Sequence, residues 1–228
     1  MDFYTLFIYF MIYSFLGWVI ETIYCSLAEK RYVPRGFLNG PLTPIYGFGA
    51  IGLIFLLQDI KTVSLVFLSG VVATSFLEYV ASYLLELIFD MHWWDYSGDK
   101  YNLNGRIKLK NSILFGILSI ILMYFIHPLV INLLSMLSYF NKQVLSVTLF
   151  IAITIDTVIT VSSIFNLKTT ALEYKIKNFS EEARLTLKNG YIHKRLLKTF
   201  PRLAYKKDFE VIDRLRLAIL NKRNNRKK

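Results

Sequence analysis

The stretch NSILFGILSIILMYFIHPLVINLLSMLS, residues 111–138, contains no Asp, Glu, Lys or Arg. A hydrocarbon core of about 30 Å is crossed by roughly 20 apolar residues of α-helix, so this stretch is long enough to span a bilayer. Four further apolar stretches occur at residues 3–25, 42–58, 63–89 and 143–166. The second of these is short, and we expect it to tilt or to enter the membrane only in part. The sequence therefore predicts an all-α integral membrane bundle of about five transmembrane helices.

The composition excludes two other classes of protein. Hydrophobic residues make up 54% of the 228 residues, which is too many for a water-soluble domain of this length. A membrane β-barrel would show segments of about ten residues with alternating polarity, whereas these stretches are longer and apolar on every side. The single cysteine, Cys25, excludes an intramolecular disulfide and a cysteine-based zinc site, and we expect a packed thiol at a helix end.

Positive charge is concentrated at the C-terminal end of the chain. From Lys168 onward there are 18 Lys or Arg against 6 Asp or Glu, whereas the preceding residues hold 9 against 10. We therefore predict a transmembrane helical domain at 1–166 and a basic cytoplasmic tail at 167–228. Within the tail, residues 206–222 carry apolar side chains at helical spacing and predict an amphipathic helix on anionic lipid, followed by a disordered basic end. Nucleic acid is not an expected partner.

The basic residues of the loops predict the orientation. Lys and Arg stay on the cytoplasmic side of short loops in membrane proteins. Five spans with the N-terminus outside and the C-terminus in the cytoplasm put every basic cluster on one face, which predicts a multi-pass protein of the cell membrane. The clusters are Lys30, Arg31 and Arg35 after the first span, Lys100, Arg106, Lys108 and Lys110 after the third, and the tail.

Four carboxylates fall inside the predicted spans. We expect Glu86, near the interface, to be solvated, and the other three lie deeper, one in each of three helices: Glu21, Glu78 and Asp156. Ionisable groups at membrane depth are costly and usually mark a function or a specific internal pair. No Lys or Arg lies at the same depth, so we expect Arg35 and Arg106 to reach them from the cytoplasmic loops, or bound protons or cations to neutralise them. A purely structural role, in which each carboxylate holds one loop arginine, remains an alternative.

The first loop contains three prolines and three glycines between residues 34 and 47, a density that precludes ordinary helix. Irregular backbone at membrane depth is tolerated where protein buries it or where it lines a wet cavity. We therefore consider Asn39 and Tyr46 as candidate site residues at a broken entrance to the second span, whose N-terminal dipole would suit an anionic group. A plain tight turn is the alternative.

The third loop interleaves aromatic and polar side chains. Trp94 and Asp95 occur in its first half, and Asn104 and Arg106 in its second. Tryptophan and tyrosine favour the headgroup region, so an interfacial anchor is one interpretation. The other is a ligand-binding floor beneath the same cytoplasmic cavity. In the following span, Pro128 removes one helical hydrogen bond and predicts a kink beside His127.

Several of these motifs, taken in order, resemble the CmpB-type putative ABC-transporter (type IV) membrane protein family. The resemblance covers residues 3 to about 166 and leaves out the basic tail. It implies a multi-spanning bacterial membrane protein labelled a permease. Lys108 stands where the family pattern has a cysteine, so no role of that thiol carries over. The motifs are Glu21, the run Arg35-Gly36-Phe37-Leu38-Asn39-Gly40-Pro41, Pro44-Ile45-Tyr46-Gly47, Glu78-Tyr79, Trp93-Trp94-Asp95-Tyr96-Ser97, Leu103-Asn104-Gly105-Arg106-Ile107 and His127-Pro128.

Three functions are compatible with these residues. The first is a permease or small transport component, whose ATPase would be a separate chain because the sequence has no GxxxxGK[ST] phosphate-binding loop. The second is an intramembrane enzyme acting on a lipid or polyprenyl headgroup, and the third is a non-catalytic regulator or assembly factor. Either a homodimer or a partner chain is implied in the first case, because five spans are few for a complete transporter.

For the transport hypothesis we expect no cofactor, no metal and no catalytic residue. The predicted ligand-binding or pathway residues are Glu21, Arg35, Asn39, Tyr46, Glu78, Trp94, Asp95, Asn104, Arg106 and Asp156.

Overall fold

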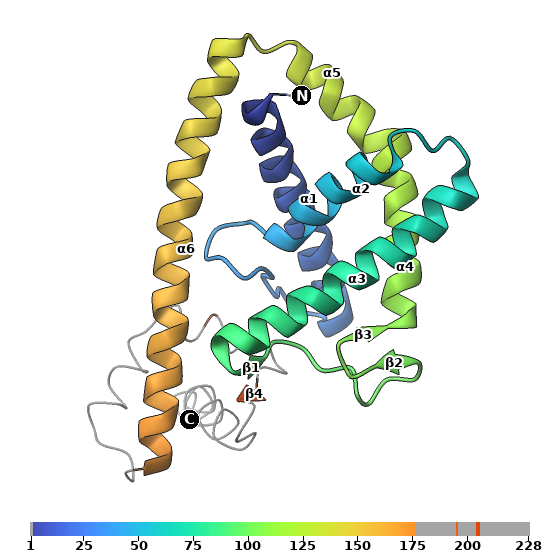
Figure 1. Cartoon of the computed structure of the whole chain (residues 1–228). Coiled ribbons are helices and arrows are strands. Elements are labelled where there is room, and N and C mark those ends of the chain that lie inside the picture. The colour runs from blue at the N-terminus through green and yellow to red at the C-terminus, as the bar shows by residue number, and fades with distance from the viewer. Residues whose placement is uncertain (1, 177–194, 196–203, 206–228) are drawn as a thin grey trace. The chain divides into compact units, whose positions relative to one another are not determined.

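The computed structural model describes residues 2–176, Arg195 and residues 204–205, with side chains described for 2–166 and Arg195 (Figure 1). Helices dominate this part of the chain, which confirms the predicted all-α class. The helices are α1 Phe3–Glu29, α2 Pro44–Leu57, α3 Val63–Phe89, α4 Leu109–Ile121, the π-helix η1 Leu122–Ile126, α5 His127–Ser135 and α6 Tyr139–Ile176. The strands have two residues each: β1 Met91–His92, β2 Asn102–Leu103, β3 Ile107–Lys108 and β4 Ala204–Tyr205.

Among the described residues, four helical segments are long and apolar enough to cross a membrane: Phe3–Glu29, Val63–Phe89, Leu109–Ser135 and Tyr139–Asn166. The chain is therefore a multi-pass membrane protein. The second predicted span, residues 42–58, contains α2, which has only 14 residues. At 1.5 Å per residue, α2 is about 21 Å long and shorter than the hydrocarbon core. The expected short second element is thus observed.

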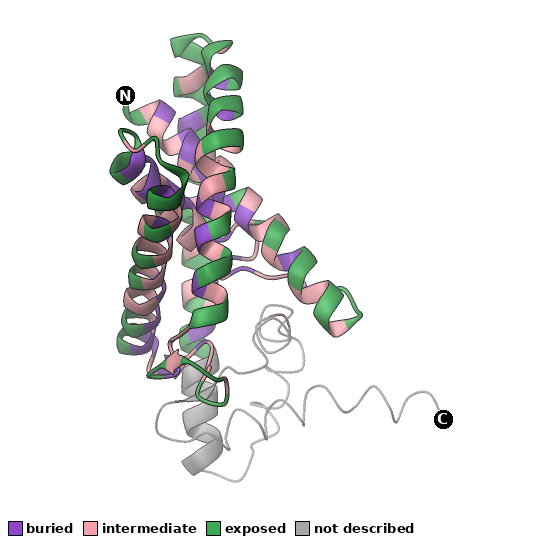
Figure 2. Ribbon diagram, turned by 90° about the vertical axis from the view of Figure 1, so that its right-hand side faces the viewer, coloured by how far each residue is buried: buried purple, intermediate pink, exposed green. Residues whose placement is uncertain are grey.

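The outer faces of the long helices carry large apolar side chains. Val72 is 69% exposed, Phe76 70% and Leu129 60%. Figure 2 shows exposed residues recurring along the helices, with buried ones between them. Exposed apolar area of this size is unfavourable in water, at about 25 cal/mol per Å². Acyl chains remove that penalty, which explains why such helices fold in a bilayer.

The chain divides into two compact units, and each is described by itself. The first comprises residues 1–81 and 96–156. Its largest apolar cluster joins α1 and α2 to α5 through Ile8, Tyr9, Tyr13, Ala50, Ile54, Val130 and Leu134.

Two glycines allow α1 and α2 to approach closely within this unit. A Cβ atom added at Gly17 would overlap the ring of Tyr46, and one at Gly47 would overlap Ser14 and Phe10. Small residues at helix crossings are common in membranes, where packing rather than apolar burial drives helix association.

The N-terminus of α1 is capped by Asp2. Its carboxylate accepts hydrogen bonds from the Thr5 backbone N–H at 2.9 Å and from the Thr5 hydroxyl at 2.7 Å. These two hydrogen bonds hold the pKa of Asp2 below its usual value, because they favour the charged carboxylate. An acceptor at this position satisfies amides that have no partner within the helix.

The predicted irregularity at Pro128 takes the form of the π-helix η1, which separates α4 from α5. Pro128 has no N–H to donate, and a wider turn just before it changes the hydrogen-bond register. The His127 ring beside it contacts α1: its Nδ1 lies 2.7 Å from the Tyr13 hydroxyl oxygen. The Tyr9 ring packs edge-on against the His127 ring, at 5.2 Å between centroids.

The second unit comprises residues 82–95 and 157–228. The ring of Phe89 packs against Trp93 and Phe165, and Nδ1 of His92 lies 3.5 Å from a carboxylate oxygen of the buried Glu86. Strand β1 pairs antiparallel with β4. Helix α6 continues as one helix past the predicted domain boundary at residue 166. The predicted amphipathic helix at 206–222 and the basic end at 223–228 lie outside the described residues.

Candidate functional site

The loop between α1 and α2, residues 30–43, turns back along α1 (Figure 1). Near its start, the backbone N–H of Val33 donates to the hydroxyl of Ser26 at 3.0 Å. At its end, the N–H of Thr43 donates to the carbonyl of Ser14 at 3.0 Å. About 18 Å of helix separates Ser26 from Ser14, at 1.5 Å per residue. The loop therefore reaches the middle of the α1 span before α2 begins. We call residues 30–43 the re-entrant loop.

Glycine and proline explain this irregular path. Gly36 has a φ of +110°, a backbone conformation that side chains of L-residues rarely adopt, and a Cβ there would lie 2.8 Å from the carbonyl oxygen of Leu42. The N–H of Leu42 in turn donates to the carbonyl of Gly40 at 2.8 Å, which makes a tight bend. Pro44 then occupies the first turn of α2, where a missing N–H costs nothing.

Asp156 of α6 binds the tip of this loop. One of its carboxylate oxygens accepts from the backbone N–H of Asn39 at 3.1 Å, and the other from that of Gly40 at 2.8 Å. A Cβ at Gly40 would lie 3.1 Å from the same carboxylate. Non-helical amides at membrane depth need a partner within the protein, and Asp156 supplies it. The predicted site residues Asn39 and Asp156 are thus brought together by a backbone contact.

The other two predicted carboxylates, Glu21 and Glu78, belong to a second set of polar residues in the same unit. Glu21 of α1 interacts electrostatically with Arg35 of the loop. Glu78 of α3 interacts with Glu21, and Tyr46 of α2 interacts with both carboxylates. Four of the predicted residues, from three helices and the loop, are therefore electrostatic neighbours. We call Glu21, Arg35, Tyr46 and Glu78 the acidic cluster.

Glu78 is the most deeply buried charged member of the acidic cluster, with 8% of its surface exposed. Its Oε2 atom has no hydrogen-bond partner in the described part of the chain. Tyr96 and Asn111 are hydrogen-bonding neighbours of its carboxylate. The amide of Asn111 donates to the Tyr96 hydroxyl at 3.1 Å. A buried carboxylate oxygen without a partner is costly unless a ligand, a water or a proton occupies it.

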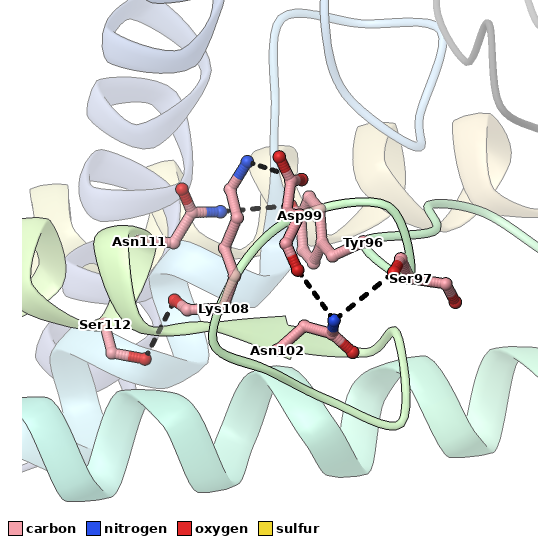
Figure 3. A network of polar contacts seen from close by, with 7 residues as sticks. All are labelled: Tyr96, Ser97, Asp99, Asn102, Lys108, Asn111 and Ser112. Atoms are coloured by element: carbon pink, nitrogen blue, oxygen red, sulfur yellow. Dashed lines mark hydrogen bonds and ion pairs between the residues drawn. The ribbon is translucent and has the colours of Figure 1, made fainter.

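A hairpin positions Tyr96 and Asn111 (Figure 3). Strands β2 and β3 pair across the three residues 104–106, and Asn104 and Gly105 both have positive φ, which is common in tight hairpin loops. The ammonium nitrogen of Lys108 lies 3.1 Å from a carboxylate oxygen of Asp99 and 4.5 Å from the centre of the Tyr96 ring. Lys108 thus orders the hairpin and the aromatic ring that contacts Glu78.

Tyr96 and Asn111 are site residues that the sequence analysis did not predict. Tyr96 was one of several aromatic residues in an anchor-like loop, and Asn111 begins an otherwise apolar stretch. The available signal was on α3, where Ser75 and Glu78 share one face. The Ser75 hydroxyl donates to that of Ser112 at 2.7 Å, one residue after Asn111. Polar residues on α3 therefore mark the side that faces α4.

The remaining predicted residues lie elsewhere. The amide of Asn104 donates to the Tyr79 hydroxyl at 3.0 Å, and the guanidinium of Arg106 lies 5.7 Å from the centre of the same ring. Trp94 and Asp95 belong to the second unit, where both are partly buried. A shared ligand floor formed by these four residues stays a prediction. The single thiol, Cys25, is partly buried and interacts with Arg35.

Comparison with known proteins identifies the family. A family model described as "Putative ABC-transporter type IV" matches residues 8–161, a range that includes the acidic cluster, the re-entrant loop and Asp156. Neither the curated proteins nor the solved structures gave a significant match. The family description supports a transport-related role. Because the match covers well over half of the chain, the protein belongs to the type IV ABC-transporter family of CmpB type.

Proposed function

We propose that this chain is the membrane-spanning permease component of a transporter, and that its transport path passes the re-entrant loop and the acidic cluster. One observation carries the proposal. Where α1, α2, α3 and the loop meet, the buried carboxylate of Glu78 keeps an oxygen without a partner in the described residues. Polar groups at membrane depth are expensive, and such a group is retained where it handles a ligand.

The broken second span supports the same function. Transporters often build their sites from discontinuous helices, whose free backbone groups and helix ends meet the substrate near the middle of the bilayer. Here α2 begins beside Ser14, in the middle of α1. The non-helical backbone of the re-entrant loop runs along the other half of α1. Several loop residues, Asn39 and Gly40 among them, are only partly buried. The loop is thus a candidate lining of the transport path and a candidate segment that moves during transport.

The orientation of the proposed permease follows from the basic loops. With the N-terminus outside and the C-terminus in the cytoplasm, the hairpin with Lys100, Lys108 and Lys110 faces the cytoplasm. Glu21 and Glu78 both precede cytoplasmic loops in this arrangement, so the acidic cluster would open to that side. The cell membrane is the expected location, and the basic tail would contact anionic lipid there.

Energy for transport would come from a partner. The family description refers to ABC transporters, and the sequence has no phosphate-binding loop motif, so the proposal requires a separate ATPase chain. A second copy of this chain would complete the path, because the described helices are few for a whole transporter.

Purification of the tagged chain from native membranes tests the proposal directly. We expect a nucleotide-binding ATPase to copurify, and the reconstituted assembly to hydrolyse ATP. Glu78→Gln should abolish transport and substrate-stimulated hydrolysis while the assembly remains intact. Recovery of the chain without any ATPase, together with normal cellular function of Glu21→Gln and Glu78→Gln, would contradict a permease role.

An intramembrane enzyme acting on a lipid or polyprenyl headgroup is the second candidate. It is favoured by the same free oxygen on Glu78, which could accept a proton, and by Arg35 beside Glu21, which could bind a phosphate. Headgroup turnover by the purified chain, lost in Glu78→Gln, would establish this candidate in place of the permease.

A further inference from the structure

We propose that the acidic cluster binds one monovalent organic cation, a ligand that carries a substituted ammonium group, with the Glu78 carboxylate as its anionic contact. The inference rests on the proposed function insofar as this cation would be the transported substrate. It concerns the binding site itself, and binding can be measured without transport.

The balance of charge is the first argument. The carboxylate of Glu78 is repelled by that of Glu21. Arg35 attracts Glu21, and Lys108 attracts Glu78. Lys108 is shared with the Asp99 carboxylate at 3.1 Å. Glu78 therefore has a second carboxylate, Glu21, as a neighbour, and it shares its ammonium neighbour with Asp99. Like charges close together in a low-dielectric environment favour the uptake of a positive charge beside them.

The geometry gives the second argument. The free Oε2 atom belongs to a carboxylate that is more than nine-tenths buried, and its neighbours come from every packed element: Glu21 from α1, Tyr46 from α2, and Tyr96 and Asn111 from the hairpin and α4. Apart from Glu78, these neighbours are only partly buried. The carboxylate is thus buried more deeply than the side chains around it.

The chemistry of the neighbours favours an ammonium group over a metal ion. Calcium takes six to eight oxygen ligands and magnesium takes six. Within the described residues, no group of three or more His, Cys, Asp or Glu side chains could hold a metal ion. The acidic cluster instead combines carboxylates with the phenol ring of Tyr46, and the phenol ring of Tyr96 lies beside it. Such rings attract organic cations through their faces, as Tyr96 already does for Lys108 at 4.5 Å.

Equilibrium binding to the purified full chain in lipid nanodiscs provides the test. The probes are radiolabelled choline and methylammonium, with sodium chloride at matched ionic strength as the inorganic competitor. We expect saturable binding of at least one ammonium probe, at one per chain, and an increase in the thermal unfolding temperature that sodium does not produce. Glu78→Gln should weaken this binding at least tenfold.

Two further variants separate ligand binding from folding. Glu78→Asp keeps the charge and should retain weakened binding. Glu86→Gln removes a buried carboxylate of the same helix, one that faces His92 in the second unit, and should change binding less than twofold. Because Gln removes a buried charge and keeps the shape of Glu, we expect Glu78→Gln to fold, as its thermal unfolding will show.

The outcomes distinguish this inference from the proposed function. It is overturned if neither ammonium probe binds saturably, if Glu78→Gln binds as well as the wild type, if sodium competes as a ligand, or if the only Glu78-dependent event is proton uptake. Should ATP-driven transport still depend on Glu78 in any of those cases, the permease stands and the substrate class is wrong. Ammonium binding without any ATPase partner would support the site and contradict the permease.

Discussion

The Asp156 carboxylate in the middle of α6 accepts a hydrogen bond from the backbone N–H of Gly40 at 2.8 Å. Its other oxygen accepts from the N–H of Asn39, so one side chain satisfies two consecutive amides of a loop that has no helix of its own. The contact ties the tip of the re-entrant loop to a helix far along the chain. It makes Asp156 a positioning residue for the loop.

Asp156→Ala should therefore release the loop. Removing the carboxylate leaves two amides without a partner at membrane depth, which costs about 1.5–3 kcal/mol of unfolding free energy. Thermal unfolding in detergent measures this loss, and the reactivity of a cysteine introduced at position 39 measures loop exposure, which should rise. Thr154→Ala is the matched control, because its hydroxyl only bonds the Phe150 carbonyl within α6. Equal stability of the two variants would contradict the anchoring role.

Much of the fold could be predicted from hydrophobic length alone. The stretch 63–89 coincides with α3, and the predicted span 143–166 lies within α6. Helix α6 continues beyond this span to Ile176, and the length of the apolar stretch did not predict that extension. Pro128 predicted a kink, and the structure has a π-helix there.

The site was only partly predictable. Chain breakers predicted an irregular loop, and the cost of buried charge predicted Arg35 as a partner of the membrane carboxylates, in agreement with its interaction with Glu21. Two contacts could not be specified from the sequence, although Asp156 and the polar face of α3 were visible in it. Asp156 binds backbone amides, which every residue carries, and Tyr96 and Asn111 reach Glu78 through a hairpin fold that spacing alone does not specify.

The crossing of α1 and α2 should not tolerate added volume. Gly17→Ala and Gly47→Ala each place a methyl group inside neighbouring atoms, and overpacking of this kind costs about 1–3 kcal/mol. Both variants should unfold at lower temperature than the wild type. Gly52→Ala, on the same helix as Gly47, meets nothing within 4 Å and should be neutral or slightly stabilising. Similar losses at all three positions would mean that the close approach of α1 and α2 does not determine the effect.

The Tyr13 hydroxyl lies 2.7 Å from Nδ1 of His127; Tyr13 is buried and His127 is partly buried. Tyr13→Phe keeps the ring and removes the hydrogen-bond partner, so we expect a loss of about 1–3 kcal/mol of unfolding free energy. Tyr139→Phe removes an exposed hydroxyl and should change stability by less than about 0.5 kcal/mol. Chemical-shift changes of the His127 ring provide a second measurement. An unperturbed His127 resonance in Tyr13→Phe would contradict the contact.

The membrane topology depends on α2, an apolar helix that is too short to cross a full hydrocarbon core by itself. The re-entrant loop supplies the missing depth, so loop and helix together should cross once. Reporter fusions at residues 35, 105 and 200 should then report the cytoplasm, and fusions at residues 60 and 140 the outside. Reporter activity at residue 60 on the same side as residue 35 would show that α2 returns to the face from which the loop entered. Four crossings would then remain, both termini would lie on one side, and the basic tail and the hairpin could no longer share the cytoplasmic face with an external N-terminus.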